Sequence, residues 1–299
     1  SNWADEVTAL ERMSKLTKSE IVAFANKYLN ENNCAVIYKK RGQDPNEKKM
    51  SKPAITPIVM NRDAVSPFLK EIQESKVEPM NPVFLNFTTD LKQLKAKTGI
   101  PVLYKQNTSN DLFQLLYLFD MGNNNDKALG LAFQYMSYLG TTDMTAEQIK
   151  SEFYRLACTF RDMPGNERTY VVLSGLNENL PEAMALFEKL MANAQVNKDT
   201  YKNLSADIIK TRKDAKLNQA QNFNRLVNYG IWGAKSPATN LLSEAELLAM
   251  DPQELINRIH QQNSYEHRIL YYGPSGEKEL LATINKLHNT PRKLTKIVP

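Results

Sequence analysis

Three histidines are the side chains of this sequence best suited to bind a metal ion or to transfer a proton. His260 and His267 stand seven residues apart, Glu266 directly precedes His267, and His288 follows later. This spacing imitates a metal-binding motif, but a break between a predicted helix and a predicted strand separates the first two histidines. We therefore expect solvent-exposed or helix-capping histidines and no metal site.

Nucleophilic catalysis finds little support in the sequence. Cys34 and Cys158 are far apart and lack metal-ligand spacing, so we predict neither a disulfide framework nor a cysteine-based zinc site. Both cysteines should be buried thiols. Ser174 has no partner histidine, which argues against a serine nucleophile.

Composition and charge indicate an ordinary globular protein. Hydrophobic residues make up 42% and charged residues 24%, which excludes a disordered or collagen-like chain. The net charge of +5 is spread along the chain, and the densest basic cluster, Lys48, Lys49 and Lys52, contains no aromatic residue. We therefore predict no nucleic-acid partner. The apolar stretch from Leu112 to Met121 is about half as long as a membrane span, so we also predict no membrane partner.

The chain divides into three predicted regions. Residues 1–42 contain a capping box of Thr17 and Glu20 before a helix, and then a strand-like run from Cys34 to Tyr38. These elements cannot bury a core alone, so we interpret residues 1–42 as the C-terminal remnant of a preceding domain. Residues 43–85 hold six prolines and are interpreted as a linker between two halves. A short apolar cluster from Val65 to Ile72 has helical spacing and should dock on a surface.

Residues 86–299 have the pattern of one α+β domain. Strand-like runs alternate with longer helical patterns, several of which begin with a capping pair such as Thr145 and Gln148. The predicted strands are Pro101–Gln106, Phe113–Asp120, Val171–Gly175 and His267–Tyr272, and the predicted helices are 126–138, 181–193, 198–228 and 278–287, with others beginning after Thr145, Ser243 and Asp251. Together they predict a largely antiparallel sheet with helices packed on one face.

One segment carries a family resemblance. Phe113 to Thr141 reads FQLLYLFDMGNNNDKALGLAFQYMSYLGT. It resembles the segment of insulinase/pitrilysin-like zinc metallopeptidases in which a strand, a turn and a helix bearing H-x-x-E-H precede Gly-Thr. Aligning the closing Gly-Thr places Leu131, Gln134 and Tyr135 at the first His, the Glu and the second His of that motif. SGLNEN from Ser174 and HRILYYGP from His267 resemble Bacteroides-type members in particular.

The resemblance implies a degenerate, non-catalytic domain of the insulinase/mitochondrial processing peptidase type. Leu131 cannot bind a metal, and Gln134 has no titratable proton to take up from a bound water. The family's third zinc ligand is a later Glu, yet no Glu lies between Glu188 and Glu244. We therefore expect no catalytic residue and no metal ligand here. Gln134 and Tyr135 are the candidate contacts to a peptide substrate, and the alternative is that this helix face is buried in the core.

The same resemblance implies a function within a larger protein. The chain would be an inner, chamber-forming segment of a zinc-dependent metalloendopeptidase that degrades peptides. Zinc would be bound by the catalytic half, in the same chain or in a partner chain, and peptides would be the substrates. The alternative is a scaffold or partner subunit of a paired peptidase, derived from a wholly inactive homologue. A periplasmic or cell-envelope location would follow from the family, and this chain alone should be inactive.

Overall fold

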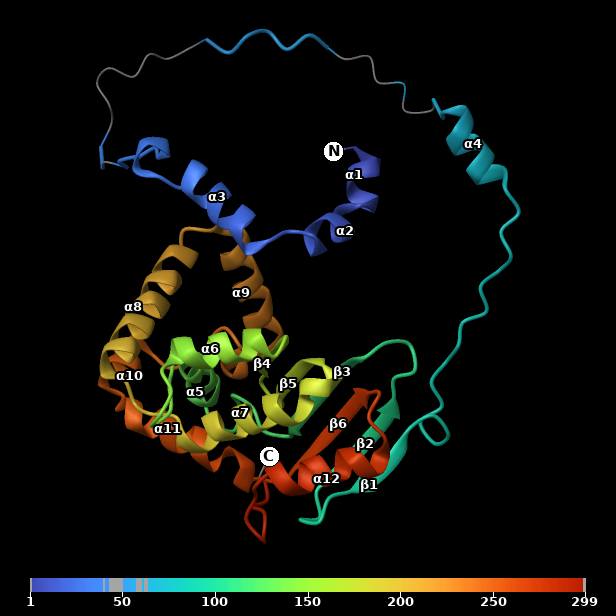
Figure 1. Ribbon diagram of the computed structural model, residues 1–299. Coiled ribbons are helices and arrows are strands. Elements are labelled where there is room, and N and C mark those ends of the chain that lie inside the picture. Colours follow the sequence, from blue (N-terminus) through green and yellow to red (C-terminus); the bar gives the residue numbers. More distant parts are fainter. Residues whose placement is uncertain (1, 40, 43–50, 58–60, 62–63, 298–299) are drawn as a thin grey trace. The chain divides into compact units, whose positions relative to one another are not determined.

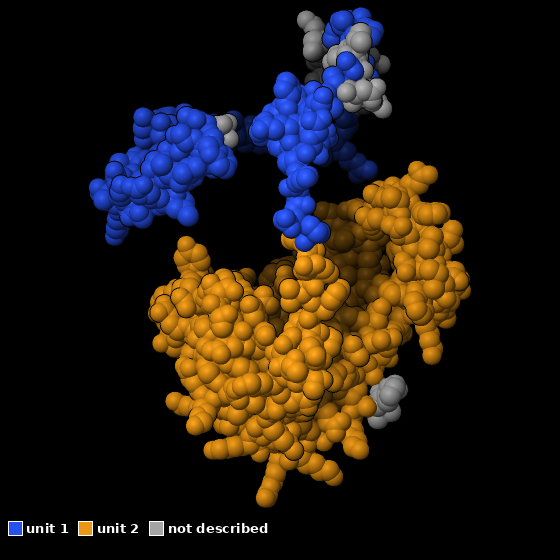
Figure 2. Space-filling model, turned by 90° about the vertical axis from the view of Figure 1, so that its right-hand side faces the viewer, with its two compact units in different colours: residues 1–79 blue, residues 80–299 orange. Residues whose placement is uncertain are grey.

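The computed structural model describes residues 2–39, 41–42, 51–57, 61 and 64–297. The chain divides into two units, residues 1–79 and residues 80–299, which Figure 2 draws in blue and orange. The division falls within the region that the sequence predicts to be a linker, part of which lies outside the described residues.

The first unit consists of short helices without a core. A capping box of Thr17 and Glu20 begins α3, as predicted, and Ser66 caps α4, in which Phe68, Leu69 and Ile72 remain exposed. None of these helices contains a buried residue. The elements are α1 (Trp3–Val7), α2 (Ala9–Ser14), α3 (Lys18–Tyr28), η1 (Glu31–Asn33) and α4 (Pro67–Glu74).

Two predictions for the first unit are wrong. Cys34 to Tyr38 form no strand, because no other described strand pairs with this extended segment. Cys34 is consequently exposed, whereas Cys158 is buried as expected.

The second unit is built on a six-stranded sheet with the order β1-β2-β6-β3-β5-β4. Only the β2–β6 pair is parallel, and all other neighbours are antiparallel. The strands are β1 (Lys92–Lys95), β2 (Pro101–Gln106), β3 (Leu112–Phe119), β4 (Cys158–Pro164), β5 (Thr169–Leu176) and β6 (His267–Gly273). The predicted α+β class with a largely antiparallel sheet is confirmed.

Alternation along the strands separates a buried face of the sheet from a more exposed one. Phe113, Leu115, Tyr117 and Phe119 of β3 are buried on one face, as their spacing of two requires. Helices cover this face, and α7 contacts β4, β5, α11 and α12 (Figure 1). Buried residues of strands and helices form one hydrophobic core cluster.

Most helices of the second unit begin where the sequence predicts. They are α5 (Leu129–Met136), α6 (Ala146–Arg155), α7 (Leu180–Asn193), α8 (Lys198–Ala215), α9 (Gln219–Trp232), α10 (Glu244–Ala249), α11 (Pro252–Gln261) and α12 (Glu277–Leu287), with short 3₁₀ turns η2 (Asn177–Asn179), η3 (Gly233–Lys235) and η4 (Gln262–Ser264). Asn218 caps α9 and divides one predicted helix into two. Asp251 caps α11, as its side chain accepts a hydrogen bond from the Gln253 N–H at 3.0 Å.

Candidate functional site

The helix that resembles the zinc-binding helix is α5, which follows β3 after a tight turn. Gly122 occupies this turn because a Cβ there would lie 2.5 Å from backbone atoms of Gly165 and Asn166. Two backbone hydrogen bonds, from Asn123 to Gly165 and from Asn124 to Asn166, tie the turn to the β4–β5 connection. The sheet therefore fixes where α5 begins.

The three aligned positions of α5 point in different directions. Leu131 is 8% exposed and belongs to the core, whereas Gln134 is exposed to solvent. The Tyr135 ring is fully buried and packs edge-on against Tyr201. Its hydroxyl donates to the carbonyl oxygen of Asn197 at 2.7 Å and accepts from the Asn197 N–H at 2.8 Å. Tyr135 thus fastens α5 to the first turn of α8.

This arrangement corrects the expectation for Tyr135. The sequence leaves two alternatives for this helix face, contact with substrate or burial in the core, and the Tyr135 ring lies in the core with its hydroxyl bound to the backbone. Burial of Tyr135 is favourable because its hydroxyl is hydrogen-bonded and its ring is packed in the core. The expected substrate contact is kept only for Gln134.

The residues of α5 do not fit a zinc ion. Leu131 carries no donor atom, and burial raises the pKa of Tyr135, which disfavours the phenolate that a metal would need. Among the described residues, no group of three or more His, Cys, Asp or Glu side chains could hold a metal ion.

An open strand edge lies beside α5 and α6. β4 ends the sheet order, and β5 is its one neighbour among the described strands. A cavity of about 700 Å³ borders this edge and is lined mainly by apolar groups, among them Leu139, Ile149, Phe153, Tyr154 and Phe160. Of these, Tyr154 is 88% exposed. The unpaired edge of β4 and an apolar cavity therefore lie next to each other.

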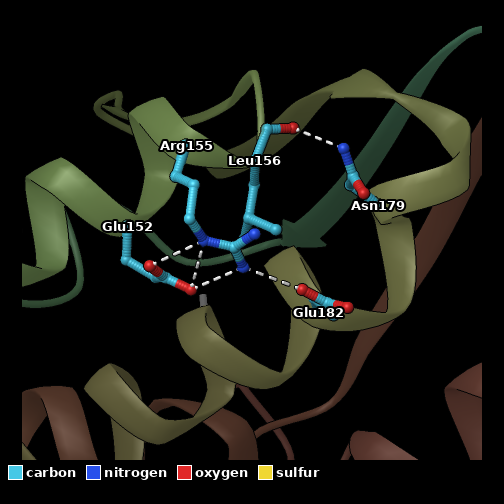
Figure 3. Close-up of polar contacts among 5 residues, drawn as sticks. All are labelled: Glu152, Arg155, Leu156, Asn179 and Glu182. Carbon is cyan, nitrogen blue, oxygen red and sulfur yellow. Dashed lines mark hydrogen bonds and ion pairs between the residues drawn. The ribbon is translucent and has the colours of Figure 1, made fainter.

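Polar contacts hold α6, which forms one wall of this cavity. Arg155 donates to Glu152 at 2.7 Å and to Glu182 of α7 at 3.0 Å, as Figure 3 shows. Asn179 donates to the carbonyl oxygen of Leu156 at 2.9 Å, which satisfies one of the free carbonyl groups at the end of α6 (Figure 3). These contacts position Tyr154 at the mouth of the cavity.

Polar side chains at the cavity do not form a catalytic group. Burial raises the pKa of the Cys158 thiol, which lowers its nucleophilicity. Burial also raises the pKa of Asp162, whose carboxylate accepts a hydrogen bond from Ser137 at 3.4 Å. Ser174 pairs with Thr159 across the sheet and lies beside no histidine.

Sequence reasoning missed a buried polar cluster on the other side of the core. His267 and His288 are 7% and 4% exposed, and their Nε2 atoms lie 2.8 Å apart. His288 Nδ1 lies 2.6 Å from Glu188 of α7. The prediction of exposed or capping histidines is therefore wrong for His267, and His288 is buried although it stands at the C-cap of α12. Only His260 is exposed.

A second, polar cavity of about 1230 Å³ opens beside His267. Its wall includes an ion-pair cluster in which Arg268 donates to both oxygens of Asp120, at 2.7 and 2.6 Å, and Arg168 donates to the same carboxylate at 3.0 Å. The cluster joins β3, β5 and β6 at one end of the sheet. Two guanidinium groups share one carboxylate, so the cluster carries a net charge of +1.

Comparisons with known proteins place this geometry in a structural family. No protein-family profile and no curated protein matches the sequence. Among solved structures, the periplasmic protease PqqL from Escherichia coli superposes with a TM-score of 0.61 at 14% identity, over 98% of this chain and 30% of PqqL. The peptidase M16 inactive domain from Pseudomonas fluorescens matches with a TM-score of 0.57 at 14% identity, over 67% of this chain and 50% of that chain.

This chain has an insulinase-like, M16 peptidase fold. The ferredoxin protease FusC, solved in complex with Arabidopsis ferredoxin, matches with a TM-score of 0.58 at 13% identity, over 95% of this chain and 29% of that chain. Such low identity concerns the fold alone. The chain spans less than a third of the length of PqqL and FusC. No described helix is long and apolar enough to cross a membrane.

Proposed function

We propose that this chain is a non-catalytic part of a zinc-dependent metalloendopeptidase and that it forms a wall of the chamber that encloses the peptide substrate. The observation that carries the proposal is α5. It follows β3 in an M16 fold, at the position that resembles the zinc-binding helix, but it presents Leu131, Gln134 and a buried Tyr135 in place of the ligands and the base.

The open edge of β4 supports a contact with an extended peptide. An edge strand presents backbone N–H and C=O groups that an incoming strand can pair with. Backbone pairing of this kind binds peptides with little sequence preference, which suits an enzyme that degrades many of them. The neighbouring apolar cavity would take one large apolar side chain of the peptide, and Tyr154 stands at its mouth.

Catalysis belongs, in this proposal, to a part of the protein beyond this chain. Zinc would be bound by a catalytic half, in the same chain or in a partner chain, since the present residues do not fit the ion. PqqL is described as a periplasmic protease. We extend that location to this chain as part of the proposal and place the protein in the cell envelope.

Binding of a labelled, unfolded peptide that contains phenylalanine tests the proposal. Tyr154→Ala should weaken binding by about tenfold, because the apolar area that the Tyr154 ring would bury against the peptide is lost. Tyr229→Ala is the matched control, since Tyr229 is 51% exposed on α9, outside the residues that line the cavity. Fluorescence anisotropy with the purified chain measures both variants.

Two results would count against a peptide-binding wall. Equal losses for both tyrosine variants would mean that exposed aromatic residues bind the peptide non-specifically. No binding to the unmodified chain, together with a stable complex between this chain and a catalytic partner, would favour the scaffold alternative.

A further inference from the structure

The distances around His267 and His288 fix how many hydrogens the two buried imidazole rings can hold between them. Tyr265 offers His267 Nδ1 a carbonyl oxygen at 2.6 Å, and a carbonyl can only accept, so His267 Nδ1 carries a hydrogen. In the neutral ring, Nε2 then carries no hydrogen and presents a lone pair. This lone pair lies 2.8 Å from the Nε2 of His288, an ordinary hydrogen-bond distance, so exactly one hydrogen fits between the two rings.

Glu188 balances the charge of the pair. Its Oε1 accepts from Tyr117 at 2.8 Å and lies 2.6 Å from His288 Nδ1, and its Oε2 accepts from Asn263 at 2.9 Å. With Glu188 ionised, His288 holds two hydrogens and the cluster is neutral. With Glu188 protonated, the hydrogen moves along the Glu188–His288 bond and the cluster is again neutral. Both arrangements contain the same number of protons.

One additional proton would disrupt this arrangement. On His267 it would go to Nε2, where it would face the hydrogen on His288 and leave a net positive charge in the core. The rings of Tyr117 and Phe119 pack against the two imidazoles, with centroid distances of 5.1 and 4.9 Å, and leave little access for water. Burial lowers the pKa of His267 to about 4; the hydrogen bond to the Tyr265 carbonyl opposes this shift, and the neighbouring His288 adds to it.

The other titratable groups near the cluster are more exposed. Beside His267, the polar cavity is lined by Asp120, Glu167, Arg168, Glu266 and Arg268, of which Asp120 is bound by both arginines. Beside Glu188, a smaller cavity is lined by His260, Lys189 and Lys286, and Lys189 is paired with Asp143. Within the described residues, Glu188 is therefore the acidic group in direct contact with the pair.

The histidine pair also lies next to the contact between the segment after α12 and the segment before β6. His288 ends α12, and Thr295 pairs with the segment just before His267, accepting from Glu266 N–H at 2.9 Å and donating to the Ser264 carbonyl at 2.8 Å. Leu294 and Ile297 pack against the core. The cluster thus joins α7, β6 and the chain after α12.

We propose that His267 and His288 share one buried proton and form an acid-sensitive clasp, which holds the segment after α12 on the sheet at neutral pH and releases it when His267 is protonated. The clasp is independent of the proposed peptide-binding surface. It belongs to the fold of the second unit and needs neither zinc nor substrate.

The sign of the pH effect follows from the direction of the pKa shift. The pKa of His267 falls from 6.5 in the unfolded chain to about 4 in the folded chain, so acid protonates the unfolded chain first. The contribution of His267 to the free energy of unfolding is fully present above pH 6.5 and is lost as the pH falls towards 4. Through His267 alone, the ratio of folded to unfolded chain should fall by about 20-fold between pH 7 and pH 5.

Urea unfolding of the full chain at pH 7, 6 and 5 measures this ratio. His267→Gln removes the titrating group, while the Gln carbonyl can still accept from His288. The variant should therefore lose the 20-fold dependence, although it is less stable at pH 7. His260→Gln is the matched control, because His260 is exposed, and it should keep the dependence of the unmodified chain. An unchanged pH dependence in His267→Gln would overturn the clasp.

Two further measurements on the unmodified chain do not depend on that variant folding. Nitrogen-15 spectra of the imidazoles at pH 5.5 should show His267 neutral, with its hydrogen on Nδ1. Hydrogen exchange of residues 288–297, corrected for intrinsic rates, should accelerate below pH 5. Titration of His267 near 6.5 would refute the proposal. So would one equivalent of zinc that stabilises the chain through these histidines, because the pair would then be a metal site.

Discussion

At the residue scale, the positions aligned with a metal-binding motif are used for packing. Tyr135 satisfies both backbone groups of Asn197, and Asn197 in turn caps α8 through its side chain. The adjacent Gln134 is exposed and has no such role in the described structure. Two neighbouring side chains on one helix therefore have separable tasks.

Tyr135→Phe should lower the free energy of unfolding by about 1 kcal/mol, because it removes both hydrogen bonds to Asn197 while keeping the ring. Gln134→Ala on the same helix is the control and should leave the free energy of unfolding unchanged within about 0.5 kcal/mol. Urea denaturation monitored by circular dichroism compares the two. If Tyr135→Phe were neutral and instead weakened peptide binding, the original expectation of substrate contact would be restored.

The sequence predicts residue chemistry well where neighbours along the chain decide it. In the aligned motif, the replacement of the first ligand by Leu131 and of the base by Gln134 follows from the residue types alone. The histidine cluster could not be predicted, since His288 and Glu188 are 100 positions apart and meet only after folding. The burial of Tyr135 depends in the same way on Asn197, 62 positions away.

At the element scale, prediction succeeds for strongly patterned segments and fails at the sheet edges. β2, β3, β5 and β6 have buried apolar residues at a spacing of two, whereas β1 and β4 contain charged or polar residues and were not predicted. Edge strands bury few side chains, so hydrophobicity marks them poorly. β4, the strand that borders the apolar cavity, became evident only from its pairing with β5.

The pairing of β4 with β5 depends on Gly175. A Cβ at this position would lie 2.5 Å from the Ala157 carbonyl oxygen and 2.5 Å from the Cys158 sulfur. Gly175→Ala should therefore displace the start of β4 and cost about 1 to 3 kcal/mol. Gly276→Ala, at a position with no atom within 4 Å of the added carbon, should cost less than about 1 kcal/mol. Thermal unfolding followed by circular dichroism distinguishes them, and equal costs would mean that the close approach is relieved by small shifts.

At the scale of the whole molecule, the two units differ in what holds them together. Every buried residue of the hydrophobic core cluster lies between Ala96 and Ile284. The helices of residues 1–79 contain no buried residue and expose Trp3, Phe24 and Phe68. Because burial of apolar area is the main stabilising contribution to folding, the second unit contains what it needs to fold.

Removal of residues 1–79 should therefore leave the urea midpoint of the second unit unchanged. The shortened chain, residues 80–299, retains the whole sheet and the core. A matched control, residues 80–287, also lacks the segment after α12, and it should unfold at lower urea because His288 and the strand contact of Thr295 are lost. Equilibrium unfolding of the three proteins at pH 7 makes the comparison. A lower midpoint for residues 80–299 than for the full chain would show that residues 1–79 stabilise the second unit, and the independence of its core would have to be rejected.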